Sequence, residues 1–364
     1  MIEKKNGMLD EEMFKNPPVS FRGIPFWSWN CKITEELIDW QLDCFKEMGF
    51  GGVDIHSRSG LDTEYLGEEY MHMIQYAVKK CREKGLLCWL YDEDRFPSGV
   101  AGGIVTKDWH MRGRYLWLTK RWGKKESYPY LLPGFAPDRE KFEAAIKGEG
   151  KKPSGYYVCA YAITFSRSGP GSGCYLKKYR RLYEEKEIWE AQQGEEDVWF
   201  AYVKLMDEEH WFEDQTYVDT MNPKAIRAFL DVTHETYYRY VGEEFGKQIP
   251  AIFTDEPRIG KHQQISFSDS SEDVTLPYTD FFAEQMKKRY GIDPLDIVPE
   301  YVWELEGGKK SANRYRYRET ACECFVQAYM DQISFWCRDH RIAMTGHVLS
   351  EDSLTAQSVT VGDC

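Results

Sequence analysis

The chain has 364 residues, 42% hydrophobic and 15% aromatic, which is enough for one large domain or two ordinary ones with a sizeable core. The net charge of -13 argues against nucleic acid and anionic membranes as partners. No apolar run approaches the roughly 18 residues of a membrane span. The polar start Met1–Asn6 lacks the apolar core of a signal peptide, so we expect a cytoplasmic protein.

After a polar lead-in, the first part of the chain alternates strands with helices. Strands are expected at residues 24–30, 51–56 and 86–91, and helices at residues 34–49 and 68–84. Short connections in this order are typical of parallel strands joined by right-handed crossovers. No GxGxxG motif follows the first strand, so a dinucleotide-binding fold is disfavoured.

The pattern changes at about Met111, where strand-like runs at 115–118, 156–165 and 198–205 predict an antiparallel β insertion up to Gln215. The helical pattern returns at Asn222-Pro223, an N-cap followed by proline at the first helical position. The remaining expected elements are strands at 249–254 and 342–348 and helices at 278–290 and 314–339.

Together these elements predict an α/β fold of the (β/α)8 TIM-barrel type with a β insertion after the third strand. The expected limits are a lead-in at 1–22, barrel segments at 23–110 and 216–364, and the insertion at 111–215. The sequence supplies about five barrel-type strands, whereas a closed barrel has eight. We therefore expect an incomplete, truncated barrel that is marginally stable or completed by a partner chain or oligomer, unless the fold closes differently.

Chemically useful side chains follow the predicted strands, and in a parallel barrel the active site lies at these strand ends. The candidates are Trp27, Trp29, Asn30, His56, Arg58, Tyr91, Asp92, Glu93, Asp94, Asp255, Glu256, His347 and Glu351. Asp255 and Glu256 follow the apolar run 251–253 and precede Pro257. Two carboxyl groups there suit general acid and base chemistry on a sugar. A solvated turn is the alternative interpretation of the same residues.

Several candidates have an equally simple structural interpretation. Trp27 and Trp29 alternate on one strand, so they face the same side and are either core residues or stacking platforms for sugar rings. His56 fits a hydrogen-bonded histidine at a strand end, and Arg58 fits an ion pair with a carboxylate of the rim. Glu351 lies in a segment that also fits a helix cap.

Five segments together resemble the α-L-rhamnosidase-type glycoside hydrolases, family 106 and its relatives. They are Pro25–Asn30, Gly51–Leu61, Leu90–Gly99, Thr254–Pro257 and Gly346–Glu351. The resemblance covers about residues 22–110 and 216–364. Members are usually longer, with further barrel strands and β-sandwich domains, so the second catalytic carboxyl group of the family could lie on a later strand.

The resemblance implies a (β/α)8 catalytic barrel that hydrolyses oligosaccharides, α-L-rhamnosides among them, with a calcium ion at the site. It implies that Glu256 is the catalytic acid and Glu351 a second active-site carboxyl group, either the base or a metal ligand. It also implies substrate contacts from His56, Arg58, Tyr91 and Glu93. From their positions at strand ends we add Trp27, Trp29, Asn30, Asp92, Asp255 and His347 as expected substrate contacts.

Two other functions fit the same sequence. One is a non-catalytic carbohydrate-binding remnant of such an enzyme, which would bind sugar without turnover. The other is a metal-dependent hydrolase of another bond that uses His56, His347 and nearby acids. We prefer the glycosidase because carboxylates dominate the predicted strand ends and no histidine-rich ligand spacing is present.

Overall fold

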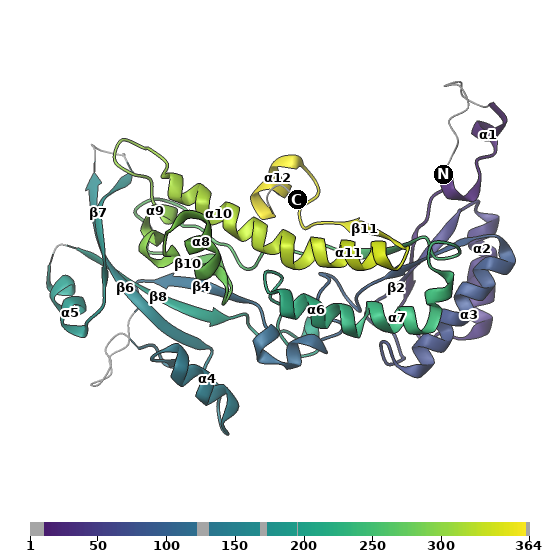
Figure 1. Ribbon diagram of the computed structural model, residues 1–364, viewed down its shortest axis with the longest axis horizontal. Helices are drawn as coiled ribbons and strands as arrows, with labels where there is room; N and C mark the ends of the chain where they lie inside the picture. Colours follow the sequence, from purple (N-terminus) through teal and green to yellow (C-terminus); the bar gives the residue numbers. More distant parts are fainter. Residues whose placement is uncertain (1–10, 122–130, 168–172, 195, 362–364) are drawn as a thin grey trace. The chain divides into compact units, whose positions relative to one another are not determined.

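The computed structural model describes residues 11–121, 131–167, 173–194 and 196–361, which divide into two compact units (Figure 1). The first unit comprises residues 1–104, 227–257 and 332–349, and the second comprises residues 105–226, 258–331 and 350–364. Part of the predicted lead-in, residues 1–10, and part of the predicted turn at 166–173, residues 168–172, lie outside the described residues. Each unit is assembled from segments that are distant in the sequence.

A five-stranded sheet forms the centre of the first unit. Its strands are Phe26–Trp29 (β1), Gly52–Ser57 (β2), Leu87–Tyr91 (β3), Ala251–Asp255 (β9) and Ala343–His347 (β11). All neighbouring strands pair in parallel, and their order in the sheet, β1-β2-β3-β9-β11, is their order in the chain. The predicted parallel α/β class is therefore confirmed. The eight-stranded barrel stays a prediction.

One helix precedes the strands of the first unit, and the others lie between them in the chain. They are Glu11–Lys15 (α1), Glu35–Glu47 (α2), Glu68–Lys84 (α3), Pro223–Val232 (α6), His234–Val241 (α7) and Asp331–Asp339 (α11). Thr34 caps α2 as predicted, because its Oγ1 accepts a hydrogen bond from the N–H of Leu37 at 3.3 Å. Gly85 ends α3 in the left-handed conformation with φ 75°.

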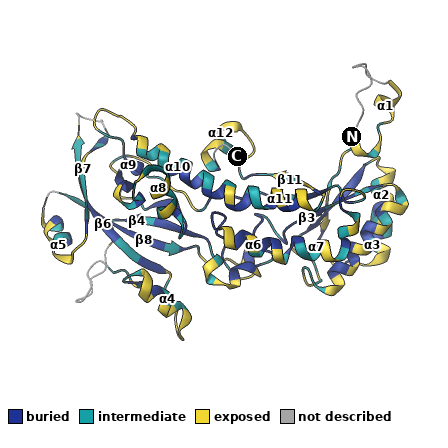
Figure 2. Cartoon of the chain, viewed as in Figure 1, coloured by how far each residue is buried: buried dark blue, intermediate teal, exposed yellow. Residues whose placement is uncertain are grey.

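Burial in the first unit follows the sheet (Figure 2). Every residue of β2 is buried, as expected for a strand covered on both faces. In β1 the burial alternates: Trp27 and Trp29 are buried, whereas Phe26 and Ser28 on the opposite face are exposed. The two faces of β1 therefore have different roles, one in the core and one near solvent.

The second unit is built on a six-stranded, mostly antiparallel sheet with strand order β10-β4-β8-β6-β5 and β7 paired to β6. Its strands are Arg114–Thr119 (β4), Phe135–Ala136 (β5), Gly155–Arg167 (β6), Cys174–Leu182 (β7), Asp197–Leu205 (β8) and Val274–Tyr278 (β10). Its helices are Arg139–Lys147 (α4), Glu185–Gln193 (α5), Phe282–Tyr290 (α8), Val298–Val302 (α9), Ala312–Phe325 (α10) and Leu354–Thr360 (α12).

Local differences from the predicted elements have tertiary causes. Tyr278 ends a strand instead of beginning a helix, because β10 pairs with β4 and α8 begins only at Phe282. The predicted helix over 314–339 is divided into α10 and α11 by a π-helical turn at Val326–Met330. Strand β7 was not predicted because its basic residues mask the strand pattern.

None of the described helices is both long and apolar enough to cross a lipid bilayer.

Candidate active site

A small cavity lies at the C-terminal ends of the strands of the first unit. Its volume is about 240 Å³, and it is lined by Phe26, Ser28, His56, Arg58, Phe96, Asp255, Glu256 and His347. Asp255 is the last residue of β9 and His347 the last of β11, and the parallel register places the two opposite each other. The sheet thus brings together side chains that are 92 residues apart in the chain.

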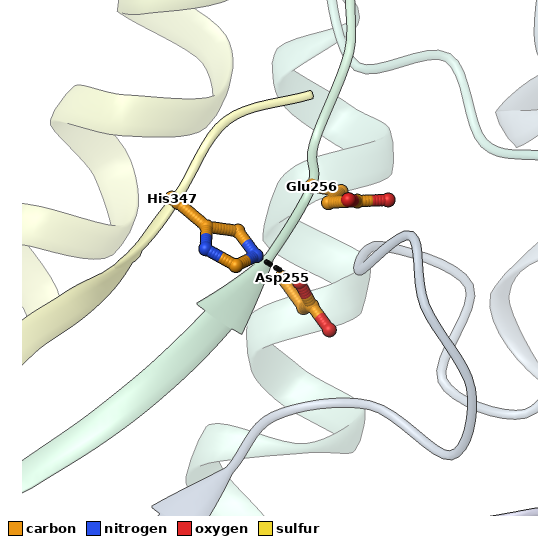
Figure 3. A group of neighbouring side chains, drawn as sticks. All are labelled: Asp255, Glu256 and His347. Carbon is orange, nitrogen blue, oxygen red and sulfur yellow. Dashed lines mark hydrogen bonds and ion pairs between the residues drawn. The ribbon is translucent and has the colours of Figure 1, made fainter. Parts of the chain in front are cut away.

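Asp255 is held on both sides of its carboxylate. The hydroxyl of Tyr91 donates to Oδ2 at 2.6 Å. Nε2 of His347 is hydrogen-bonded to Oδ1 at the same distance (Figure 3). The side chain is buried, so these charge-assisted bonds are strong. With both oxygens engaged, Asp255 is suited to positioning its neighbours more than to exchanging protons with a substrate.

Glu256 differs from Asp255 in its backbone and its exposure. It is half-buried at the cavity and has φ 48°, a left-handed conformation that is uncommon for a residue with a side chain. Its N–H donates to the carbonyl of His347 at 2.9 Å, which fixes this conformation across β9 and β11. Such strain costs about 1–3 kcal/mol and is concentrated at functional sites.

Aromatic rings form the floor of the cavity. His56 stacks on Tyr91 with ring centroids 3.7 Å apart, and Phe26 contacts both rings edge-on. Burial, reinforced by the charge of Arg58, lowers the pKa of His56 to about 3, so its imidazole is neutral near pH 7. Arg58 lies over the ring of Phe96 at 5.6 Å. The cavity therefore combines an apolar floor with carboxylates and one guanidinium group at its wall.

A chain of buried hydroxyl groups supports Tyr91 from behind. Tyr237 donates to the carbonyl of Tyr91 at 3.1 Å, and it is hydrogen-bonded to Tyr70, which in turn bonds Ser57. Burial and the neighbouring Asp255 raise the pKa of Tyr91 far above its usual value, so its hydroxyl stays a donor to that carboxylate. This network fixes the orientation of Asp255.

Glu93 organises the loop that follows β3. Its two carboxylate oxygens accept hydrogen bonds from five backbone N–H groups, those of Asp94, Gly99, Val100, Ala101 and Gly102, at 2.7–3.0 Å. The side chain has no exposed surface. Burial raises the pKa of Glu93 to about 7, although the backbone donors favour its ionised form. Phe96, which lines the cavity, lies on this loop.

Glu93→Gln is expected to destabilise the protein by about 1.5–3 kcal/mol, because the amide nitrogen of glutamine would then face backbone N–H donors. Urea unfolding at about pH 8, above the folded-state pKa of Glu93, measures this loss. Glu83→Gln, at a side chain that is 49% exposed, is the control and should stay near wild type. Equal unfolding midpoints for both variants would contradict the role of Glu93 in the loop.

The structure separates the other candidates by burial. Trp27 and Trp29 are buried in the core, where Trp27 Nε1 donates to Gln41 and Trp29 packs on Tyr70. Asp92 is buried and accepts from Ser98 Oγ at 2.6 Å. These placements give the three residues packing and positioning roles, and their substrate contacts stay untested predictions.

Two further candidates are exposed. Asn30 is exposed just after β1, and Glu351 is exposed in the second unit. The cavity of the first unit is lined by five of the candidates: His56, Arg58, Asp255, Glu256 and His347.

Three lining residues were missed by the sequence reasoning: Phe26, Ser28 and Phe96. Phe26 and Ser28 occupy the strand face opposite Trp27 and Trp29, and alternation alone could have identified them as a pair. Nothing in the local sequence around Phe96 indicates that its loop returns to the sheet. That return depends on Glu93 and on Ser98, whose Oγ accepts from the N–H of Asp255 at 2.8 Å.

The group Asp255, Glu256 and His347 has the donor types of a metal site, with one ligand atom of each within 4.8 Å of the others. Calcium prefers six to eight oxygen ligands. This group offers a nitrogen and two carboxylates, and both oxygens of Asp255 already accept hydrogen bonds, so it does not fit the implied calcium ion. Imidazole with carboxylate suits Zn²⁺ or Mn²⁺ better.

Two buried histidines of the first unit predict loss of stability in acid. Burial lowers the pKa of both His56 and His234 to about 3, and the next contributions come from Arg58 and His340. Between about pH 6.5 and pH 3 the unfolded chain binds protons that the folded chain does not. Each histidine should therefore lower stability by about 1.4 kcal/mol per pH unit as the pH falls.

His234→Gln should make the fall in unfolding free energy between pH 6 and 4 shallower by about 1.4 kcal/mol per pH unit. Chemical unfolding at several pH values measures this slope. His72→Gln, at a side chain that is 61% exposed, is the matched control and should keep the wild-type slope. A wild-type slope in the His234 variant would show that this imidazole is protonated in the folded state.

With the geometry established, comparisons with known proteins show a likeness of fold. No protein-family model matches the sequence. No curated protein matches it either. The structure is similar to that of a rhamnosidase from Novosphingobium sp. PP1Y, with a TM-score of 0.53 and 14% sequence identity. The likeness covers 93% of this chain and 47% of that one, so the chain spans about half the length of this solved structure.

At this identity the likeness shows a similar fold and no more. It does not extend to family membership or to substrate. The site residues therefore rest on the geometry of the cavity.

Proposed function

We propose that the protein is a glycoside hydrolase of the α-L-rhamnosidase type, in which Glu256 supplies the acid of a carboxyl-based mechanism. The observation that supports this most is Glu256 itself, held in a strained conformation at the C-terminal end of a parallel strand and beside a cavity. In (β/α)8 enzymes catalytic residues come from these strand ends. The sequential parallel order of the strands agrees with part of such a barrel.

The cavity favours a substrate with one terminal or side-chain sugar. Its volume of about 240 Å³ is below the roughly 300–1,000 Å³ usual for drug-sized ligands, so it suits a single ring more than an extended chain. In this proposal the rings of Phe26 and Phe96 contact the apolar face of the sugar. Arg58 and His347 contact its hydroxyl groups.

The reaction requires two carboxyl groups with different tasks, one that donates a proton to the leaving oxygen and one that activates water or attacks the sugar. Glu256 has the first role in our proposal. Asp255 is poorly suited to the second role, because both of its carboxylate oxygens are already hydrogen-bonded, one to Tyr91 and one to His347. We keep Glu351 as the second carboxyl group, as the sequence resemblance implies.

A metal-dependent hydrolase is the second candidate function, and the group Asp255, Glu256 and His347 is the observation that favours it. In that case His347 would give up its bond to Asp255 and bind the ion through Nε2. A bound ion of this kind supplies Lewis-acid activation of a water molecule or of the scissile bond.

One experiment separates these functions. The purified chain is assayed on a panel of aryl glycosides that includes an α-L-rhamnoside, and on aryl phosphate and acyl esters, before and after EDTA treatment. Hydrolysis of a glycoside that survives EDTA is the expected result. Ester hydrolysis that EDTA abolishes and Zn²⁺ or Mn²⁺ restores would replace the glycosidase with the metal-dependent enzyme. Folded protein without turnover on any substrate would leave the carbohydrate-binding remnant.

A further inference from the structure

The second unit contains a larger cavity of its own, with a volume of about 630 Å³. Its wall combines the start of β7, the loop 262–268, the end of α9, one face of α10 and residues of α12. This volume lies in the range of pockets that enclose small organic ligands. None of the predicted site residues lines it, so it requires a separate explanation.

Hydrogen bonds hold the wall of this cavity in place. The Ser268 hydroxyl accepts from the N–H of Cys174 at 2.8 Å, and the Trp303 indole donates to the carbonyl of Ser268 at 3.1 Å. His262 is hydrogen-bonded to the hydroxyl of Tyr301 at 3.0 Å. The loop is thereby fastened to β7 and α9, which gives the cavity a defined shape.

Two arginines face the cavity from α10. Arg314 and Arg318 are four residues apart, so they lie on the same face of the helix. Within the described residues neither guanidinium has a carboxylate at ion-pair distance, although the chain has an excess of acidic residues. Arg314 donates to the carbonyl of Val302 at 3.3 Å and Arg318 to the carbonyl of Val359. Arg318 is also hydrogen-bonded to the side chain of Tyr301.

The Nε of Arg314 is buried and has no hydrogen-bond partner among the described residues. An unsatisfied buried donor is costly, and a guanidinium fork pairs well with a carboxylate or another oxyanion. Two such groups at one cavity therefore indicate a negatively charged ligand. Glu304 also lines the cavity and leaves a net positive wall when both arginines are counted.

Aromatic side chains add a second recognition element. Phe267 lines the cavity with 74% of its surface exposed, so its ring is accessible to a ligand. Tyr175 lines the same cavity and is half-buried. Rings of this kind present flat apolar surfaces to the C–H faces of sugars.

We propose that this cavity of the second unit binds an acidic oligosaccharide, with Arg314 and Arg318 holding the carboxylate of a uronic acid residue and Phe267 stacking on a sugar ring. The oligosaccharide class rests on the proposed function, whereas the preference for an anion rests on the arginines alone.

The test uses trigalacturonate and its fully methyl-esterified form, which differ in charge but little in shape. Calorimetric titration of the whole chain should show trigalacturonate bound at least tenfold more tightly than the ester, with affinity that falls as NaCl is raised. Arg318→Gln should weaken binding of trigalacturonate at least tenfold, and Arg318→Lys should recover part of the loss. Equal binding of the two ligands would overturn the proposal.

Two further variants guard against effects of misfolding. Phe267→Ala changes an exposed ring and should weaken trigalacturonate binding several-fold, while Trp189→Ala, at an exposed ring (56%) of α5 outside the cavity, should not. Glu256→Gln should bind trigalacturonate as wild type does.

Charge-dependent binding of trigalacturonate without any glycosidase turnover would contradict only the proposed function. Turnover without charge-dependent binding, or binding unchanged in Arg318→Gln, would remove the proposed cavity ligand.

Discussion

Glu256→Gln is expected to lower kcat on the best aryl glycoside by roughly 100- to 10,000-fold, the range that a positioned proton donor contributes. Glutamine keeps the size and polarity of the side chain but cannot donate a proton to the leaving oxygen. KM should change little, because the cavity wall is otherwise intact. Stopped assays at substrate concentrations above and below KM measure both constants.

The control is Glu47→Gln at the exposed end of α2, which should retain wild-type kcat. Thermal unfolding of both variants shows whether either one perturbs the fold. Wild-type kcat in a folded Glu256→Gln protein would exclude this carboxyl group from catalysis. A parallel assay of Glu351→Gln tests the second carboxyl group, with a similar loss expected.

Gly346→Ala is expected to cost more than about 4 kcal/mol or to prevent the first unit from folding. A Cβ at this position would lie 1.9 Å from the carbonyl oxygen of Thr254, and the backbone has φ 136°. Gly346 pairs with Thr254 in the sheet, and the next residue is His347, so the glycine lets β11 approach β9 beside the cavity. Urea unfolding followed by tryptophan fluorescence measures the loss.

Gly49→Ala is the matched control within the same unit. Its φ of 86° is also positive, in the left-handed region, but no heavy atom lies within 4 Å of the added Cβ. Backbone strain alone should cost about 1–2 kcal/mol there. An unfolding midpoint for Gly346→Ala close to that of Gly49→Ala would show that β11 moves away from β9 without loss, and it would weaken the assignment of His347 to the cavity.

The sequence alone located the elements whose signals are local. Helix α3 spans Glu68–Lys84 as predicted, because its apolar spacing and the glycine that follows it are read within one segment. The same holds for the cap at Thr34 and for Asp255 and Glu256 at the end of an apolar strand. These features depend on near neighbours in the chain, so a single sequence contains the information.

Only the tertiary structure decided what each of these side chains does. It turned Trp27 and Trp29 into the core and Phe26 toward the cavity, joined Asp255 to Tyr91 and His347, and closed a loop on Glu93. It also recruited β10 from beyond the predicted insertion of residues 111–215 into the sheet of the second unit. These outcomes depend on contacts between residues that are far apart in the chain, whose partners are selected by packing and hydrogen bonding in the folded state and leave no periodic signal in the sequence.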